Sequence, residues 1–224
     1  GAPTSNPFQQ YLKKYGEVAS FQASTAEELL AINELKTYDL LIVSLHASQS
    51  PDVSILQQLA QDTPTILVFF TPPYAMDPYK PAIDAADAVI MAYDTTSFAQ
   101  MSAAQGIFGG ISFCGKLPVT TASFPEGSGL ITPKTRLSYS QPEEVGIPSE
   151  RLSGIEPIAL EGIRQHAYPG CQILVAKDGV IIYEREFGHF DYSESPEVTD
   201  GTVYDLASMT KASATLPAIM KLYD

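Results

Sequence analysis

Two short, uninterrupted apolar runs place the strongest limit on how this chain can fold. Residues 38–45 (YDLLIVSL) and 65–70 (TILVFF) have the length of strands, and neither alternates regularly between apolar and polar residues. A strand of this kind is covered on both faces, as in a parallel sheet enclosed by helices. Residues 52–61 lie between the two runs and have apolar residues at helical spacing, as a crossover helix requires. We therefore expect an α/β fold in which residues 38–45 form a central strand.

The same pattern extends over residues 15–121 and predicts a parallel-sheet α/β sandwich of the flavodoxin-like type. Short apolar runs alternate there with helix-length amphipathic segments, in the order β-α-β-α-β-α-β-α. Residues 1–14 are expected to form an N-terminal tail. Besides the elements already named, we expect strands at residues 17–22 and 88–92 and helices at residues 26–35, 81–86 and 97–108.

A change in composition after residue 121 separates a second unit. Residues 122–142 are rich in proline, glycine and serine and show little hydrophobic periodicity, which is typical of a linker. Residues 143–224 predict a truncated α+β segment, because the sequence ends inside a helical pattern that starts near Tyr204 and that Pro217 is expected to kink. The other expected elements are a helix at residues 149–165 with Ser149 as its N-cap, and a hairpin of residues 172–176 and 180–183 around an Asp-Gly turn.

Charge and residue spacing exclude several classes of function. With 13 lysine and arginine residues against 26 acidic ones, the net charge of −13 repels phosphate backbones, so no nucleic-acid partner is expected. The apolar runs are far shorter than the about 18 residues that indicate a membrane span. The three histidines lack the spacing of a zinc site, and we expect neither a metal nor a cofactor. Cys114 and Cys171 could form one disulfide, but buried free thiols are the favoured interpretation.

A candidate nucleophile lies in the second unit, where Ser208-Met209-Thr210-Lys211 forms an S-x-x-K tetrad. Residues at positions i and i+3 share a helix face, so the amine of Lys211 can reach the hydroxyl of Ser208. A lysine whose pKa is lowered by desolvation could take the serine proton, and a helix N-terminus would favour the developing negative charge. The serine and lysine content of the chain predicts about one such pair by chance, so the tetrad alone does not separate catalysis from coincidence.

The sequence around the tetrad resembles the opening of serine β-lactamase-like hydrolases, the group that includes penicillin-binding proteins. The resemblance rests on Pro169-Gly170-Cys171, the hairpin QILVAKDGVIIYEREFG and residues 202–211 (TVYDLASMTK), and it covers residues 143–224. It implies that Ser208 is the nucleophile and that Lys211 assists proton transfer. The second and third motifs of that group, a Tyr or Ser followed two residues later by Asn and a Lys-Thr-Gly-like strand, would lie beyond Asp224.

Residues 15–121 have a resemblance of their own, to the C-terminal α/β domain of family 3 glycoside hydrolases. It rests on residues 87–93 (DAVIMAY), residues 103–110 (AAQGIFGG) and above all residues 115–120 (GKLPVT). The resemblance implies a β-N-acetylhexosaminidase whose catalytic acids lie in a preceding barrel domain, which this sequence does not contain. Asp94, just after an expected strand, is a candidate acid only by residue type, and a solvated structural role is the default.

Together the two resemblances imply a fragment of a bacterial hydrolase, periplasmic or at the cell surface, whose substrate is a glycan or a small peptidoglycan-derived molecule. The isolated chain is expected to be inactive. Because the second domain is incomplete, we expect it either to associate with another chain, such as a second copy, or to remain mobile. The apolar hairpin residues expected to be exposed are Ile173, Val175, Ile181 and Ile182. Two alternatives remain open, a non-catalytic α/β ligand-binding or structural module and a flavodoxin-like small-ligand domain.

Overall fold

A computed structural model describes residues 6–23, 35–46, 52–193 and 196–223. The chain divides between Tyr139 and Ser140 into two compact units, which are described separately. Within the described residues, no helix combines the length and the hydropathy that crossing a membrane would need.

A three-stranded parallel sheet forms the centre of the first unit. Strands β1 (Leu41–His46), β2 (Thr65–Phe70) and β3 (Ala88–Met91) lie side by side in this order, so β2 is the middle strand. The last four side chains of β2 are almost completely buried, which confirms the expectation drawn from its apolar run. The prediction that residues 38–45 form a central strand is wrong, because β1 lies at the edge of the described sheet.

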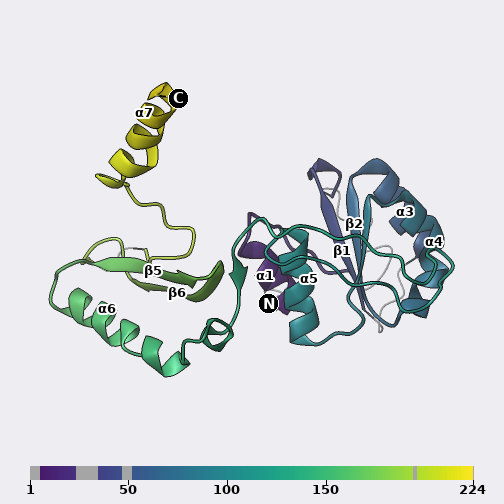
Figure 1. Cartoon of the computed structure of the whole chain (residues 1–224), viewed down its shortest axis with the longest axis horizontal. Coiled ribbons are helices and arrows are strands. Elements are labelled where there is room, and N and C mark those ends of the chain that lie inside the picture. The colour runs from purple at the N-terminus through teal and green to yellow at the C-terminus, as the bar shows by residue number, and fades with distance from the viewer. Residues whose placement is uncertain (1–5, 24–34, 47–51, 194–195, 224) are drawn as a thin grey trace. The chain divides into compact units, whose positions relative to one another are not determined.

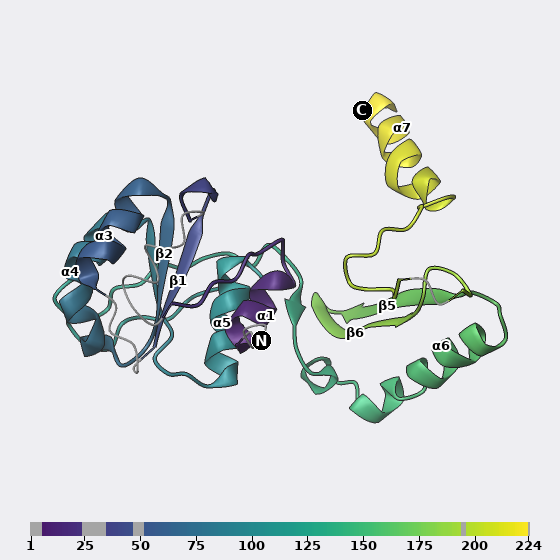
Figure 2. The same ribbon diagram turned by 180° about the vertical axis from the view of Figure 1, so that it is seen from behind.

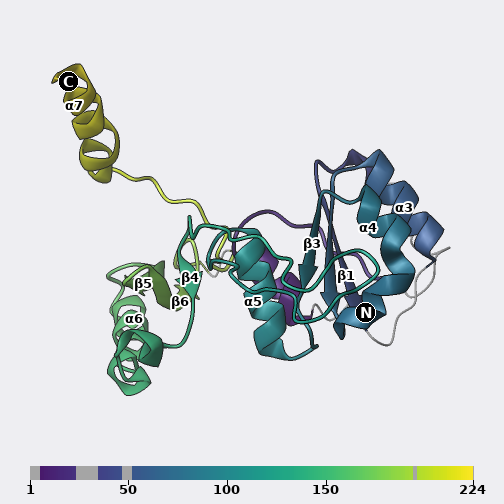
Figure 3. The same cartoon turned by 45° about the vertical axis from the view of Figure 1, so that its right-hand side comes forward.

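Helices cover the two faces of this sheet and make a three-layer arrangement (Figure 1). Helices α3 (Val53–Asp62) and α4 (Lys80–Ala85) lie on one face, and α1 (Pro7–Lys13) and α5 (Ser97–Ile107) lie on the other, as the turned view also shows (Figure 3). Successive side chains of a strand point to opposite faces, so β2 supplies both cores. Leu67 and Phe69 pack with α3 and α4, whereas Val68 and Phe70 pack with α1 and α5.

The expected N-terminal tail contains α1. Asn6 accepts a hydrogen bond from the Gln9 N–H at 2.9 Å and Pro7 occupies the first helical position, two features that favour a helix start. Phe8 and Leu12, one helical turn apart, are 1% and 3% exposed in the core. This segment is therefore part of the first unit and contributes to its stability.

The strand expected at residues 17–22 is absent. Its two large apolar residues, Val18 and Phe21, are three positions apart, so they cannot share one face of a strand, whose period is two. Instead the Phe21 ring packs edge-on against Tyr38 with ring centroids 5.9 Å apart, and the Phe21 carbonyl accepts a hydrogen bond from Gln9 Nε2. The helix expected at residues 26–35 lies almost wholly outside the described residues, which resume with the 3-10 turn η1 (Leu35–Thr37).

Residues 108–139, here called the strap, run over the first unit without long regular elements and include only the short strand β4 (Ser138–Tyr139). Thr135 N–H donates to the Gly109 carbonyl at 2.8 Å, and Ala122 N–H donates to Asp77 of η2 (Pro73–Tyr79) at 2.7 Å. Residues 122–139 of the expected linker therefore belong to the first unit.

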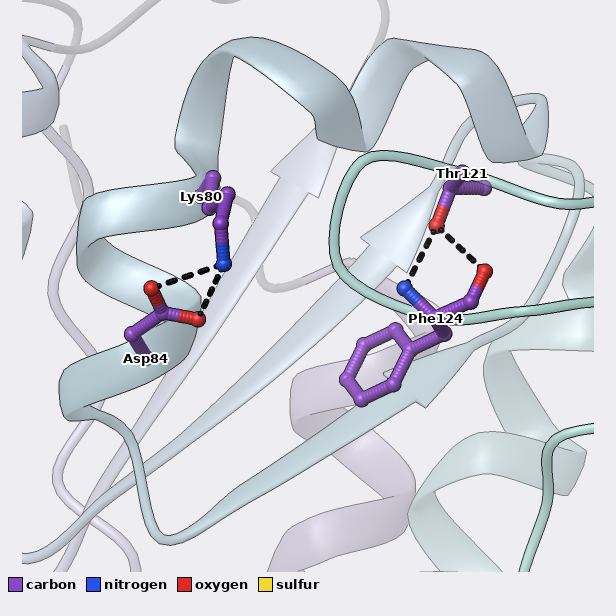
Figure 4. Close-up of polar contacts among 4 residues, drawn as sticks. All are labelled: Lys80, Asp84, Thr121 and Phe124. Carbon is purple, nitrogen blue, oxygen red and sulfur yellow. Dashed lines mark hydrogen bonds and ion pairs between the residues drawn. The ribbon is translucent and has the colours of Figure 1, made fainter.

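A tight turn fixes the middle of the strap. The Thr121 hydroxyl accepts a hydrogen bond from the Phe124 N–H at 3.1 Å and donates to the Phe124 carbonyl at 3.3 Å (Figure 4). The Phe124 ring packs against the core beneath α3 and α4. The same view shows Lys80 and Asp84, which form an ion pair on the surface of α4 with both oxygens 2.9 Å from Nζ. The turn thus anchors this part of the proline- and glycine-rich strap to the core of the first unit.

The second unit contains the expected hairpin. Strands β5 (Gly170–Lys177) and β6 (Val180–Gly188) pair antiparallel, and Asp178 and Gly179 both have positive φ, 53° and 78°. Two central residues with positive φ are what a type I′ hairpin turn requires, so this prediction is confirmed.

The expected helix at residues 149–165 is divided. A 3-10 turn, η4 (Ser149–Leu152), precedes α6 (Ile155–Arg164), and a second turn, η3 (Pro142–Val145), lies before them. Ser149 does not cap the helix, because its hydroxyl and its N–H both donate to Glu143, at 2.6 and 2.8 Å. Helix α6 lies along the hairpin (Figure 2), and its Glu156 forms an ion pair with Arg185 of β6.

Candidate functional site

Ser208 and Lys211 meet at the start of the last helical segment. Ser208 lies in the turn that precedes the helix, whose first residue is Met209. Lys211 Nζ donates a hydrogen bond to Ser208 Oγ at 2.9 Å, and Lys211 N–H bonds the Ser208 carbonyl at 3.1 Å. The structure therefore brings together the two residues singled out in the sequence, at the spacing that a shared helix face predicts.

The turn before Ser208 has a strained backbone. Ala207 has φ of +42°, a left-handed conformation that a residue with a Cβ adopts at a cost of roughly 1–2 kcal/mol. Asp205 Oδ1 accepts a hydrogen bond from the Ala207 N–H at 2.9 Å, and the Ala207 carbonyl accepts one from the Thr210 N–H at 3.1 Å. Ala207 is thus held from both sides. This turn was not predicted from the sequence, although an aspartate two residues before the bonded N–H is a recognised turn signal.

The helix beyond Lys211 opens into a π-helical turn, η5 (Lys211–Thr215), before it continues as α7 (Leu216–Tyr223). Leu216 N–H bonds the Lys211 carbonyl, five residues back. Pro217 follows at once; it has no N–H to donate, and its ring would crowd the carbonyl four residues back in a regular helix. In place of the kink expected at Pro217, the helix has a widened turn that begins at Lys211 itself.

Contacts with β5 hold the segment that leads to the site. Gln172 Nε2 donates to the Asp200 carbonyl at 3.1 Å. Tyr204 lies near Cys171; partial burial, and secondarily this thiol, raise the pKa of the Tyr204 phenol. Ser208 and Lys211 are themselves exposed within the described chain.

Large exposed apolar side chains of the second unit lie on α7, and also on α6 and the hairpin, where Ile158 and Leu174 are 72% and 52% exposed. Ile181 and Ile182, which were expected to be exposed, are each 7% exposed, because α6 packs against β6. Ile173 and Val175 are half-buried. The large apolar side chains of α7 that are more than half exposed are Leu216, Ile219, Met220, Leu222 and Tyr223.

Two aspartates of the first unit, Asp87 and Asp94, accept hydrogen bonds from threonine residues. Asp94 accepts hydrogen bonds from the N–H and hydroxyl of Thr96, at 2.8 and 2.6 Å, and these bonds lower the pKa of its carboxyl group. Asp87 accepts a bond from the Thr65 N–H at 2.9 Å. Asp94 thus precedes the N-cap of α5 and shapes the turn that starts this helix.

Metal ligands do not gather in the described part of the chain, where no group of three or more His, Cys, Asp or Glu side chains could hold an ion. Both cysteines are free thiols, as expected, but Cys114 is exposed and Cys171 is half-buried. The prediction that both thiols are buried is wrong. Cys114 lies in a part of the strap that forms no helix or strand.

Comparison with known proteins bears on the second unit. Residues 155–224 match the family model described as "Beta-lactamase". Proteins of Escherichia coli O157:H7 and of Escherichia coli strain K12, both described as "Putative D-alanyl-D-alanine carboxypeptidase", are 37% and 38% identical to the chain over 93 residues. A protein of Salmonella enteritidis PT4 with the same description is 33% identical over 93 residues.

Each of these alignments covers 38% of this chain and 21% of the relative, so the chain spans about a fifth of the length of the curated relatives it matches. No solved structure matches the chain significantly. No comparison supports a family 3 glycoside hydrolase part. The second unit is similar to serine hydrolases of the β-lactamase and penicillin-binding-protein group and homologous to the named carboxypeptidases, as the residues around Ser208 had indicated.

Proposed function

We propose that the second unit forms part of a serine acyl-transfer domain in which Ser208 is the nucleophile and Lys211 is the base. The observation that carries this proposal is the hydrogen bond between Lys211 Nζ and Ser208 Oγ, at 2.9 Å. In its neutral form the amine can accept the hydroxyl proton as the serine oxygen attacks a carbonyl carbon. Ser208 immediately precedes the helix that starts at Met209, and the positive end of a helix dipole would stabilise negative charge on the attacking oxygen.

The names of the relatives suggest the substrate class, a peptide that ends in D-alanyl-D-alanine. In that reaction the Ser208 oxygen bonds to the carbonyl carbon of the penultimate residue, and the peptide C–N bond breaks. The departing amine takes up a proton, and water later hydrolyses the serine ester. We also propose that the protein acts in the periplasm or at the cell surface, where a peptidoglycan-derived substrate would be found.

The test is acylation by a penicillin-type probe and by a fluorophosphonate in the full-length protein. Mass spectrometry of the digest is expected to find the label on Ser208, and Ser208→Ala is expected to abolish it. Ser213→Ala is a matched control, because Ser213 lies on the same helical segment and donates its hydroxyl to the Met209 carbonyl at 2.9 Å. A folded protein that refuses every acylating probe would favour the non-catalytic binding module instead.

For the first unit we propose the role of the α/β domain that accompanies a β-N-acetylhexosaminidase barrel in family 3 glycosidases. Support comes from the motifs at residues 87–93, 103–110 and 115–120 and from the parallel sheet between two helix layers. Hydrolysis of a glycoside requires a pair of carboxyl groups around the sugar, and Asp94 is engaged with Thr96. The 224-residue chain is thus expected not to hydrolyse a chromogenic N-acetylglucosaminide. Turnover that survives repurification and is lost in Asp94→Asn would overturn this assignment.

A further inference from the structure

We propose that Asp205 is a positioning residue for the nucleophile, acting through Ala207; this inference rests on the proposed function of Ser208. Asp205 is three residues before Ser208, outside the S-x-x-K tetrad. Its Oδ1 accepts a hydrogen bond from the Ala207 N–H at 2.9 Å. Ala207 lies in the turn between residues 202–206, which form no helix or strand, and the helix that carries Lys211.

The backbone at Ala207 needs such support. Its φ of +42° is unfavourable for any residue with a Cβ, and strained conformations of this kind persist only where their surroundings hold them. The hydrogen bond from Asp205 fixes the N–H on one side of the strained residue, and the bond from Thr210 N–H fixes its carbonyl on the other. Without the first of these bonds, the peptide before Ser208 is free to relax to a negative φ.

A change in the backbone conformation of Ala207 would move the adjacent nucleophile, Ser208. The Ser208 carbonyl accepts the Lys211 N–H at 3.1 Å, and this first helical turn sets the 2.9 Å approach of Lys211 Nζ to Ser208 Oγ. Misplacement of a reacting pair lowers the rate of the chemical step more than it lowers binding. We expect loss of the Asp205 bond to reduce the rate of acylation at saturating probe while leaving the apparent dissociation constant of the probe unchanged.

The role of Asp205 depends on its oxygen as an acceptor and not on its charge. A negative charge beside a serine that develops negative charge would oppose the reaction, so charge alone predicts that removal of Asp205 speeds acylation. Asparagine keeps the acceptor oxygen and removes the charge. Asp205→Asn and Asp205→Ala therefore separate the two effects.

The experiment measures acylation of Ser208 by a penicillin-type probe in the full-length protein. We expect Asp205→Ala to slow acylation at saturating probe by about tenfold. The free energy that a side-chain cap typically contributes corresponds to about this change in rate. Asp205→Asn is expected to stay within about threefold of the unaltered protein, since its oxygen can accept the same bond. Asp191→Ala is the control, because Asp191 Oδ1 makes the same kind of turn bond, to Ser193 N–H at 2.7 Å, in another loop.

A second substitution makes the test specific to the strained backbone. Glycine adopts positive φ without penalty, so Ala207→Gly in the Asp205→Ala background is expected to recover most of the lost rate. Equal rates for Asp205→Ala and the unaltered protein would overturn the inference, and so would an Asp205→Ala defect that glycine at position 207 fails to relieve. If the unaltered protein is not labelled at Ser208, the proposed function fails, and the inference falls with it. Unchanged melting temperatures show that each rate is that of a folded variant.

Discussion

The side-chain amide of Gln105 binds both main-chain groups of Tyr139. Its Nε2 donates to the Tyr139 carbonyl at 3.1 Å, and its Oε1 accepts the Tyr139 N–H at 2.6 Å. Gln105 belongs to α5 and is 2% exposed, so the final residue of the first unit is fixed to the core of that unit. Tyr15 adds to this arrangement, because its hydroxyl also lies within hydrogen-bond distance of Gln105 Oε1, at 3.2 Å.

Replacement of Gln105 should release the end of the strap. We expect Gln105→Leu to reduce the free energy of unfolding of the first unit by about 2–4 kcal/mol, because two main-chain groups of Tyr139 lose their partner. In the unaltered chain, we expect limited proteolysis to cleave after Tyr139 before it cleaves within residues 122–137. In the Gln105→Leu variant, cleavage within residues 134–141 should be faster than in the unaltered chain. Gln58→Leu, on the exposed side of α3, is the control. Identical digestion patterns would show that Gln105 does not hold the strap.

Tyr15 should make the first unit sensitive to high pH. Burial, and then the neighbouring Tyr139, raise the pKa of Tyr15 to about 12 from the usual 10.0. Because the folded state favours the neutral phenol, this contribution to stability is complete below pH 10.0 and is lost as the pH rises toward about 12. Tyr15→Phe is expected to lose about 1 kcal/mol at neutral pH, through the hydrogen bond to the Leu137 carbonyl, and to show a smaller further loss between pH 10 and 12. Denaturant unfolding at a series of pH values measures this, with Tyr74→Phe as an exposed control.

Replacement of Lys211 should lower the rate of acylation and leave the stability of the fold unchanged. Lys211→Ala is expected to slow labelling of Ser208 by about 10²- to 10⁴-fold, the usual contribution of a positioned base. Lys211 is exposed in the described chain, so the melting temperature should stay close to that of the unaltered protein. Lys221→Ala, in the last turn of α7, removes the same charge without contact with Ser208 and should label at the normal rate. A Lys211→Ala protein that is labelled as fast as the Lys221→Ala protein would show that another group takes the proton.

Phe69 should be among the most sensitive positions in the core. It is fully buried on β2, between α3 and α4, and packs edge-on against Tyr79 with ring centroids 5.7 Å apart. Phe69→Ala is expected to destabilise the first unit by about 3–5 kcal/mol, through lost burial and the cavity left behind. Phe98→Ala is the matched control, because Phe98 is 76% exposed at the start of α5 and should change stability little. Equal losses in the two variants would contradict the three-layer core.

The sequence predicts those elements that are marked by consecutive residues, either an apolar run or a turn dipeptide. The strand β2 is predicted to the residue because every position from 66 to 70 is apolar, and the hairpin is predicted because Asp178-Gly179 can adopt two positive φ angles. Helix α1 was missed because only Phe8 and Leu12 mark its buried face, although Asn6-Pro7 is a helix-start signal. Short elements carry too few residues for their periodicity to be recognised.

In the candidate site, too, the feature that depends on local spacing was predicted. The meeting of Ser208 with Lys211 depends only on local helix geometry, so the three-residue spacing predicts it. The left-handed backbone at Ala207 was not predicted, since alanine has no preference for positive φ, although the bonds that hold it come from the nearby Asp205 and Thr210. The strap, by contrast, owes its order to distant partners such as Gln105 and Asp77, which its own composition does not encode.

The position of α1 has a consequence for biosynthesis. The Phe8 ring packs against Phe70 with ring centroids 5.2 Å apart, and the Phe8 N–H bonds the side chain of Gln100, which is 92 residues further along the chain. A ribosome releases residues in their order along the chain, so Phe8 and Leu12 of α1 stay uncovered by α5 until α5 has emerged and can pack against them. Such long-range closure slows folding, and the nascent chain is most exposed to misfolding and to chaperone capture during this interval.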